Sequence, residues 1–190
     1  MASKKKKRPV STEPPIKVVF LDFDGVLNND VWIKERWAAG EGQIVLTQVM
    51  PEHVALLNQL LERSGAKVVI SSSWRHHYGL FDTLSRSGRD AGDSLKNILE
   101  RAGFKGELIG RTPDGWPGIR FSEPRLRGKE IQAWITEWQR SGKPLVEKFV
   151  ILDDDDDMAH LRKNHFVQTD PMKGLIQADV DKALVILGAS

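Results

Sequence analysis

Three continuous apolar runs, separated by segments with helical periodicity, constrain the fold of this chain more than any other feature. Each run reads as a strand that is buried on both faces; they lie at residues 17–22, 66–73 and 148–152. A shorter run at 165–169 predicts a fourth strand. Helical patterns occupy residues 51–63, 93–104, 127–142 and 178–187. Strands that alternate with helices predict an α/β fold with a doubly wound, mainly parallel sheet and helices on both faces.

The first fifteen residues, MASKKKKRPVSTEPP, differ in composition from the rest of the chain. They contain five basic residues, one acidic residue and three prolines. The net charge of the whole chain is +2, so the remainder carries about −2. We interpret residues 1–15 as a disordered basic tail and residues 16–190 as a single domain. Such a tail can attract nucleic acid, act as a nuclear address or only aid solubility.

Composition excludes several classes of site. The chain has no cysteine, which removes disulfides, thiolate metal ligands and cysteine nucleophiles. No apolar run approaches the ~20 residues of a membrane span, and the N-terminus lacks the apolar segment of a signal peptide. We therefore expect no membrane association and a cytoplasmic location, or a nuclear one if the chain is eukaryotic and the basic tail serves as an address.

Polar side chains follow each of the three long strands. Asp22 and Asp24 follow the first, Ser71 to Ser73 end the second, and the third runs into five consecutive aspartates, residues 153–157. Ligands of open parallel sheets bind beyond the carboxyl ends of the strands, so these groups are expected on one rim. Carboxylates without histidine or cysteine favour a hard cation such as Mg²⁺, which would offset their mutual repulsion and the cost of burying them.

Four segments together resemble the signatures of the haloacid dehalogenase (HAD) superfamily of phosphohydrolases. FLDFDGVLN is similar to the first signature, VVISSSW to the second, RGKEI to the third and FVILDDDDDM to the fourth. Within that superfamily, these segments and TDPMKGL most resemble the small HAD domain of Swiss Army Knife RNA repair proteins. The resemblance implies a HAD-like fold, either capless or with only a small flap.

The resemblance also implies roles in phosphoryl transfer. Asp22 would be the nucleophile that forms an aspartyl-phosphate, and Asp24 the general acid and base. Ser72 would contact the transferring phosphoryl group, with Ser71 as the alternative because three consecutive serines leave the register open. Arg127 would bind the phosphate, with Lys129 as the alternative.

The same resemblance implies a Mg²⁺ site. Its ligands would be the side chains of Asp22 and Asp153 and the backbone carbonyl of Asp24. The second acid of the fourth signature would be Asp154 or Asp157, because the run of aspartates fits both spacings used in the superfamily.

The function implied is a Mg²⁺-dependent phosphomonoesterase. After the predicted helix and strand are subtracted, residues 28–50 leave room only for a short flap. An open site resembles capless members that act on large substrates, so we expect a phosphorylated macromolecule such as an RNA or DNA end. The alternatives are a small-molecule (nucleotide or sugar) phosphatase, a phosphotransferase, and a nucleic-acid-associated module with little catalysis.

Overall fold

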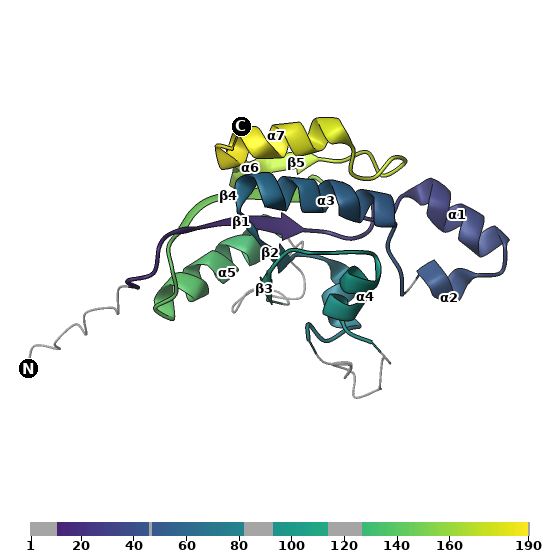
Figure 1. The fold of residues 1–190 in the computed structure, drawn as a ribbon, viewed down its shortest axis with the longest axis horizontal. Coiled ribbons are helices and arrows are strands. Elements are labelled where there is room, and N and C mark those ends of the chain that lie inside the picture. The colour runs from purple at the N-terminus through teal and green to yellow at the C-terminus, as the bar shows by residue number, and fades with distance from the viewer. Residues whose placement is uncertain (1–10, 46, 82–92, 114–126, 190) are drawn as a thin grey trace, which may run out of the picture.

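A five-stranded parallel sheet forms the centre of the fold (Figure 1). The computed structural model describes residues 11–45, 47–81, 93–113 and 127–189, so most of the predicted tail lies outside the described residues. The strands are β1 (Ile16–Leu21), β2 (Lys67–Ile70), β3 (Leu108–Arg111), β4 (Val146–Asp153) and β5 (Phe166–Gln168). Their order is β3-β2-β1-β4-β5 and every pair is parallel. The predicted α/β fold with a parallel sheet is confirmed.

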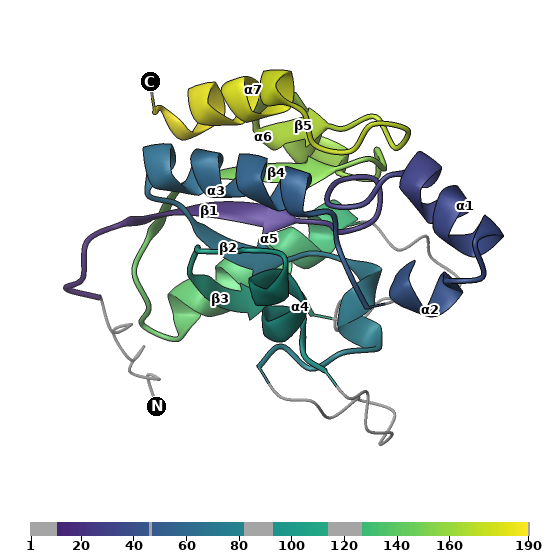
Figure 2. The same cartoon turned by 45° about the vertical axis from the view of Figure 1, so that its right-hand side comes forward.

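Helices cover both faces of this sheet (Figure 2). Alternate residues of β1 point to opposite faces, which explains the continuous apolar run. Val19 and Leu21 join the core beneath α3 (Pro51–Ser64), α4 (Leu95–Arg101) and α7 (Gln177–Leu187). Val18 and Phe20 join a second core beneath α5 (Arg127–Arg140). Among the described residues, no helix is both long and apolar enough to cross a membrane.

Local sequence determines where two of these helices, α3 and α4, begin and end. Helix α3 begins at Pro51, which has no backbone N–H and so leaves no donor unpaired in the first turn. The helix ends at Gly65, which adopts the left-handed conformation. The helix predicted from residue 93 begins two residues later, as α4. Ser94 is the N-cap of α4, and its hydroxyl accepts a hydrogen bond from the Asn97 N–H. Asp93 instead accepts from the Ser94 N–H and pairs with Arg101.

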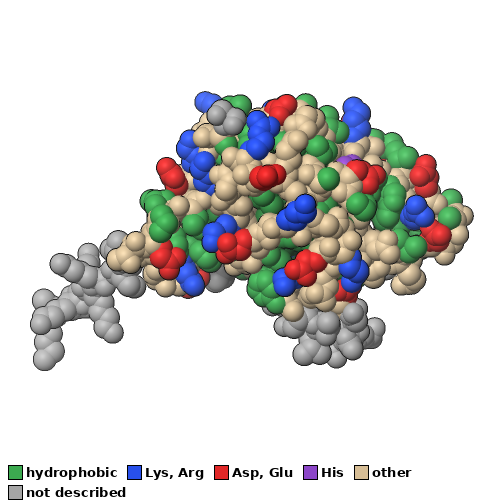
Figure 3. All heavy atoms as spheres, in the orientation of Figure 1, with side chains coloured by type: hydrophobic (Ala, Val, Ile, Leu, Met, Phe, Trp, Pro, Cys, Tyr) green, Lys and Arg blue, Asp and Glu red, His purple; other side chains and the backbone are tan. Residues whose placement is uncertain are grey.

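The segment between β1 and α3 forms a small flap of two short helices, α1 (Asp30–Ala38) and α2 (Gly42–Val45). Asn29 caps α1 by accepting from the Trp32 N–H, and no residue of α1 is buried. The remaining short elements are η1 (Ser73–His76), η2 (Ala159–Leu161) and α6 (Arg162–His165). On the face shown in Figure 3, basic and acidic side chains are interspersed with hydrophobic ones and form no patch of one sign.

Candidate active site

Three adjacent strands bring the predicted site residues to one edge of the sheet. Leu21, the last residue of β1, is in register with Ile70 of β2 and Leu152 of β4. Asp22 therefore lies between Ser71 and Asp153. Backbone hydrogen bonds continue the ladder there, because the Asp22 N–H donates to Leu152 and the Ser71 N–H donates to Leu21.

A cluster of three carboxylates forms at this edge. One oxygen each from Asp22, Asp153 and Asp154 lies within 4.8 Å of the others. Asp22 and Asp153 are buried, and Asp154 is half-buried. The structure thus gathers these three of the four predicted metal ligands by their side chains, whereas Asp24 was predicted to contribute its backbone carbonyl.

Gly25 is the residue that lets the first signature approach the fourth. Its φ is +67°, and a Cβ at this position would lie 2.3 Å from Asp154 Cγ. The Gly25 carbonyl also accepts a hydrogen bond of 2.7 Å from the buried Thr169 hydroxyl. A side chain at residue 25 would therefore both strain the backbone and displace the Asp154 carboxylate.

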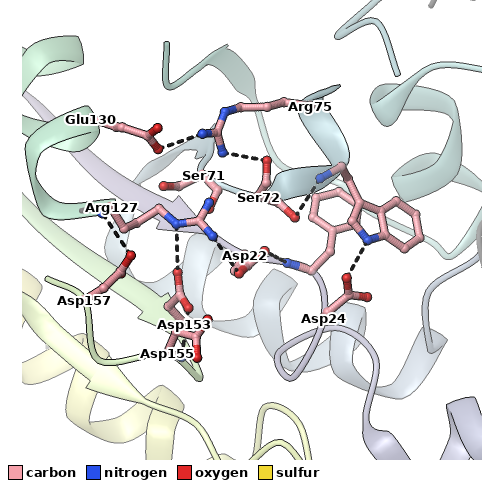
Figure 4. Close-up of polar contacts among 12 residues, drawn as sticks. Asp22, Asp24, Ser71, Ser72, Arg75, Arg127, Glu130, Asp153, Asp155 and Asp157 are labelled. Carbon is pink, nitrogen blue, oxygen red and sulfur yellow. Dashed lines mark hydrogen bonds and ion pairs between the residues drawn. The ribbon is translucent and has the colours of Figure 1, made fainter. Parts of the chain in front are cut away.

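Arg127 is the first residue of α5, and its side chain extends to this cluster (Figure 4). Its guanidinium lies 3.4 Å from Asp22 Oδ2 and 3.6 Å from Asp153 Oδ2, and it donates to the Ser71 carbonyl. Lys129, the alternative, is exposed. Of the two cations considered from sequence, only Arg127 faces the carboxylates.

Asp157 anchors the start of α5 rather than joining the carboxylate cluster. Its Oδ2 accepts a hydrogen bond of 3.1 Å from the Arg127 N–H, one of the first-turn donors that have no partner within a helix. Gly128 allows the close approach, since a Cβ there would lie 2.2 Å from the Met158 carbonyl oxygen. The fourth signature thus fixes the backbone from which Arg127 extends.

We expect Gly128→Ala to destabilise the protein because its new methyl group would meet backbone, which cannot rotate away. Overpacking of this kind costs about 1–3 kcal/mol and should lower Tm by about 5 °C. Thermal unfolding followed by circular dichroism measures the change. Lys129→Ala, one residue further on and exposed, is the matched control and should leave Tm unchanged. An unchanged Tm for Gly128→Ala would contradict the close approach of α5 to Met158.

Burial dominates the electrostatics of the cluster. It raises the pKa of Asp22 to about 6, although Arg127, the Ser72 hydroxyl and the Phe23 N–H favour the ionised form. Burial and then the charge of Asp22 raise the pKa of Asp153 to about 9, with Arg127 opposing the rise. Both carboxylates are therefore held in an environment that disfavours their negative charge.

The serines after β2 differ in what their hydroxyls face. The Ser72 hydroxyl favours the ionised form of Asp22 and so lowers the pKa of that carboxyl group, and its Oγ accepts from the Trp74 N–H at 3.3 Å. Ser71 Oγ is fully buried, points away from Asp22 in Figure 4 and has no hydrogen-bond partner among the described residues. The geometry therefore places the Ser72 hydroxyl, rather than that of Ser71, beside the predicted nucleophile.

Asp24 lies beside the cluster and is held by a residue of the second signature. The Trp74 indole N–H donates a hydrogen bond of 2.8 Å to Asp24 Oδ2. The sequence analysis did not identify this contact. The two residues are fifty positions apart, and no local pattern joins them.

A buried ion pair supports the second signature. Arg75, which follows Trp74, is buried and lies 2.6 Å from the equally buried Glu130. Its guanidinium also donates to the Ser72 carbonyl at 2.7 Å. Glu130 was missed by sequence reasoning, although it stands three residues after Arg127 and so lies on the same side of α5.

The donor set fits a hard dication. The three clustered side chains offer carboxylate oxygen only, which is what Mg²⁺ prefers. Asp153 Oδ2 is buried and makes no hydrogen bond to any described residue; its nearest cation is the Arg127 guanidinium at 3.6 Å, so its lone pairs are available to a metal ion. A bound dication would also favour the ionised forms of Asp22 and Asp153 that burial opposes.

Comparison with known proteins supports the resemblance expected from the four signatures. A family model described as the HAD domain in Swiss Army Knife RNA repair proteins matches residues 18–180. This match includes every residue of the site described above. Searches of curated proteins and of solved structures returned no match.

Proposed function

The chain belongs to the family of HAD domains in Swiss Army Knife RNA repair proteins, and on that basis we propose that it is a Mg²⁺-dependent phosphomonoesterase. The observation that carries the proposal is the position of Asp22. Its buried carboxylate lies among two further carboxylates, the Ser72 hydroxyl and the Arg127 guanidinium. A nucleophile, a cation for phosphate and oxygen ligands for a metal are the parts that phosphoryl transfer through an aspartate requires.

The reaction we propose has two steps. Asp22 attacks phosphorus, the bond from phosphorus to the leaving oxygen breaks, and that oxygen takes the proton of the Asp24 carboxyl group. Water then attacks the aspartyl-phosphate and gives its proton to Asp24, while the bond between phosphorus and the Asp22 oxygen breaks. Inorganic phosphate leaves, and both aspartates return to their starting states.

The neighbouring side chains have supporting roles in this scheme. Ser72 and Arg127 hydrogen-bond the non-bridging phosphate oxygens and so orient phosphorus toward Asp22. The side chains of Asp22, Asp153 and Asp154 and the backbone carbonyl of Asp24 would hold Mg²⁺. When bound, the ion screens the phosphate charge against the anionic nucleophile.

For the substrate, we propose a terminal phosphate on RNA or DNA. The flap contains one helix of nine residues and one of four, which together are shorter than a cap domain. A site without a cap excludes water poorly around a small ligand, so affinity has to come from an extended partner. The description of the family points to RNA, and the basic tail can supply electrostatic attraction to a polynucleotide.

We expect a phosphorylated oligonucleotide to be a better substrate than the corresponding mononucleotide. The expected ratio of kcat/KM is about tenfold or more at low salt and declines as salt is raised, because phosphate contacts release counterions. Initial rates of phosphate release from 3′- and 5′-phosphorylated oligonucleotides, measured beside mononucleotides and sugar phosphates, give this ratio.

A matched chain that lacks residues 1–15 shows whether the preference for an oligonucleotide comes from the basic tail or from the folded domain. If the tail supplies the attraction, truncation should reduce the ratio and its salt dependence while leaving hydrolysis of an aryl phosphate unchanged. Equal or better rates on mononucleotides or sugar phosphates would instead identify a small-molecule phosphatase. Faster release in the presence of alcohol or sugar acceptors, with phosphate passed to them, would identify a phosphotransferase.

A further inference from the structure

We propose that Trp74 is a positioning residue for the proton transfer by Asp24: its indole N–H fixes the carboxyl group so that the proton is carried on Oδ1 and directed at the leaving oxygen. This inference rests on the proposed function, since it assumes that Asp24 protonates the leaving group. It adds a residue from the second signature to the acid and base chemistry assigned to the first.

The first step of the argument is the hydrogen bond itself. The distance from Trp74 Nε1 to Asp24 Oδ2 is 2.8 Å, a full-strength contact for an N–H donor (Figure 4). An indole N–H can only donate. The oxygen that receives it therefore acts as an acceptor, and because a carbonyl oxygen accepts better than a hydroxyl oxygen, the contact favours Oδ1 as the oxygen that carries the hydrogen when the carboxyl group is protonated.

The second step is the rigidity of Trp74. The residue is 7% exposed, and its ring lies between Phe23, at a centroid distance of 4.9 Å, and Tyr78, at 5.8 Å. Its backbone N–H donates to Ser72 Oγ, and its carbonyl accepts from the N–H groups of His77 and Tyr78. Packing and backbone hydrogen bonds thus fix the Trp74 indole N–H, so it can fix the orientation of the Asp24 carboxyl group.

The third step is the setting of Asp24. This side chain is only half-buried, in contrast to Asp22 and Asp153. The Trp74 indole is the one hydrogen-bond donor among the described residues that is recorded on its carboxylate. A half-exposed carboxylate samples several rotamers unless it is restrained, and general acid catalysis requires a fixed approach to the leaving oxygen. Phe23, whose ring packs against Trp74, also lies between Asp22 and Asp24 in the chain.

The leaving group distinguishes positioning of the acid from a purely structural role. A nitrophenolate leaves as a stable anion and needs little protonation, whereas an alkoxide from an alkyl phosphate needs a proton in the transition state. Loss of acid catalysis therefore slows alkyl phosphates far more than aryl phosphates, by about 10²–10⁴-fold for complete loss. General damage to the fold or to phosphate binding slows both classes by the same factor.

The test compares kcat/KM, which reports the steps up to departure of the leaving group, for p-nitrophenyl phosphate and for an alkyl phosphate in four proteins. Trp74→Phe keeps an aromatic ring beside Phe23 and Tyr78 but removes the N–H. We expect it to lower kcat/KM about tenfold or more for the alkyl phosphate and about twofold or less for the aryl phosphate. Asp24→Asn should show the same selectivity more strongly. In the double variant, Trp74→Phe should add little to Asp24→Asn, because both act through one group.

Trp138→Phe is the matched control. It also removes a partly buried indole hydrogen bond, of 2.9 Å to the Pro144 carbonyl, but on α5 at a distance from the site. This variant should leave the ratio between the two substrates unchanged. If Trp74→Phe does not fold, a tryptophan analogue with sulfur in place of the indole N–H, introduced at residue 74, removes the donor at nearly constant volume.

The outcomes separate the inference from the function on which it rests. A wild-type protein without Mg²⁺-dependent phosphatase activity on either substrate would overturn the proposed function. A wild-type protein that is active, with equal losses on both substrates in Trp74→Phe or full additivity with Asp24→Asn, would overturn the positioning role of Trp74 alone.

Discussion

Asp22→Asn is expected to abolish phosphatase activity, with a fall in kcat on the order of 10³-fold or more. The amide is a poor nucleophile and cannot form the acyl-phosphate, and it also removes one negative ligand from the metal site. Because Asp22 is buried in a site that disfavours its charge, the variant should fold at least as well as the wild type. Initial rates with an aryl phosphate and Mg²⁺ measure the loss.

Asp181→Asn is the matched control for this change. It makes the same chemical substitution on α7, where the side chain is 60% exposed, and it should leave the rate unchanged. Retention of more than about a tenth of the wild-type rate by Asp22→Asn would rule out Asp22 as the nucleophile. Trapping of a phosphorylated protein in the wild type, with its loss in Asp22→Asn, would identify the intermediate directly.

Asp153→Asn is expected to have opposite effects on activity and on the stability of the metal-free protein. It should remove Mg²⁺-dependent activity, by about 10²-fold or more, because it replaces a buried anionic ligand by a neutral one. In EDTA, the same change should raise Tm by about 4 °C or more, since folding of the wild type must keep a proton on this carboxyl group far above its ordinary pKa, a cost that the Asn side chain does not carry.

The direction of the pH dependence follows from the pKa of Asp153. Burial and the charge of Asp22 raise this pKa from 3.8 to about 9 in the folded protein. Between these values, the folded state holds a proton that the unfolded state has released, so stability falls as pH rises. We therefore expect metal-free wild type to have a lower Tm at pH 8.5 than at pH 6, and Asp153→Asn to lose much of this difference.

Added Mg²⁺ tests whether the same carboxylate cluster binds a metal ion. A dication bound to the ionised carboxylates should raise the wild-type Tm more at pH 8.5 than at pH 6, and should raise that of Asp153→Asn little. A lower Tm for Asp153→Asn in EDTA, or equal stabilisation of both proteins by Mg²⁺, would contradict the metal site. Differential scanning fluorimetry over the two pH values measures all of these quantities.

The sequence by itself determined the architecture and the place of the site. Continuous apolar runs made β1, β2 and β4 recognisable as strands covered on both faces, and their alternation with helices predicted a parallel sheet. Parallel strands bring their carboxyl ends to one edge, so Asp22, Ser72 and Asp153 could be placed together before any contact was known. The four signatures then identified the family, because their order along the chain is itself specific.

Only the tertiary structure decided which of several equivalent side chains face the cluster. The hydroxyl of Ser72, rather than that of Ser71, interacts with Asp22. Asp154, rather than Asp157, joins Asp22 and Asp153 in the carboxylate cluster. Neighbouring residues of one type have the same local propensity, and which of them turns inward depends on where the strand ends and how the loop curves. The sequence pattern contains no information on that direction.

Contacts between distant segments were also beyond the sequence. The hydrogen bond from Trp74 to Asp24 and the ion pair of Arg75 with Glu130 join residues that are 50 and 55 positions apart. The Asp157 cap on α5 spans 30 positions. Such pairs form because packing of helix against sheet brings the loops together, and local periodicity determines which residues are buried but not which partner each one meets.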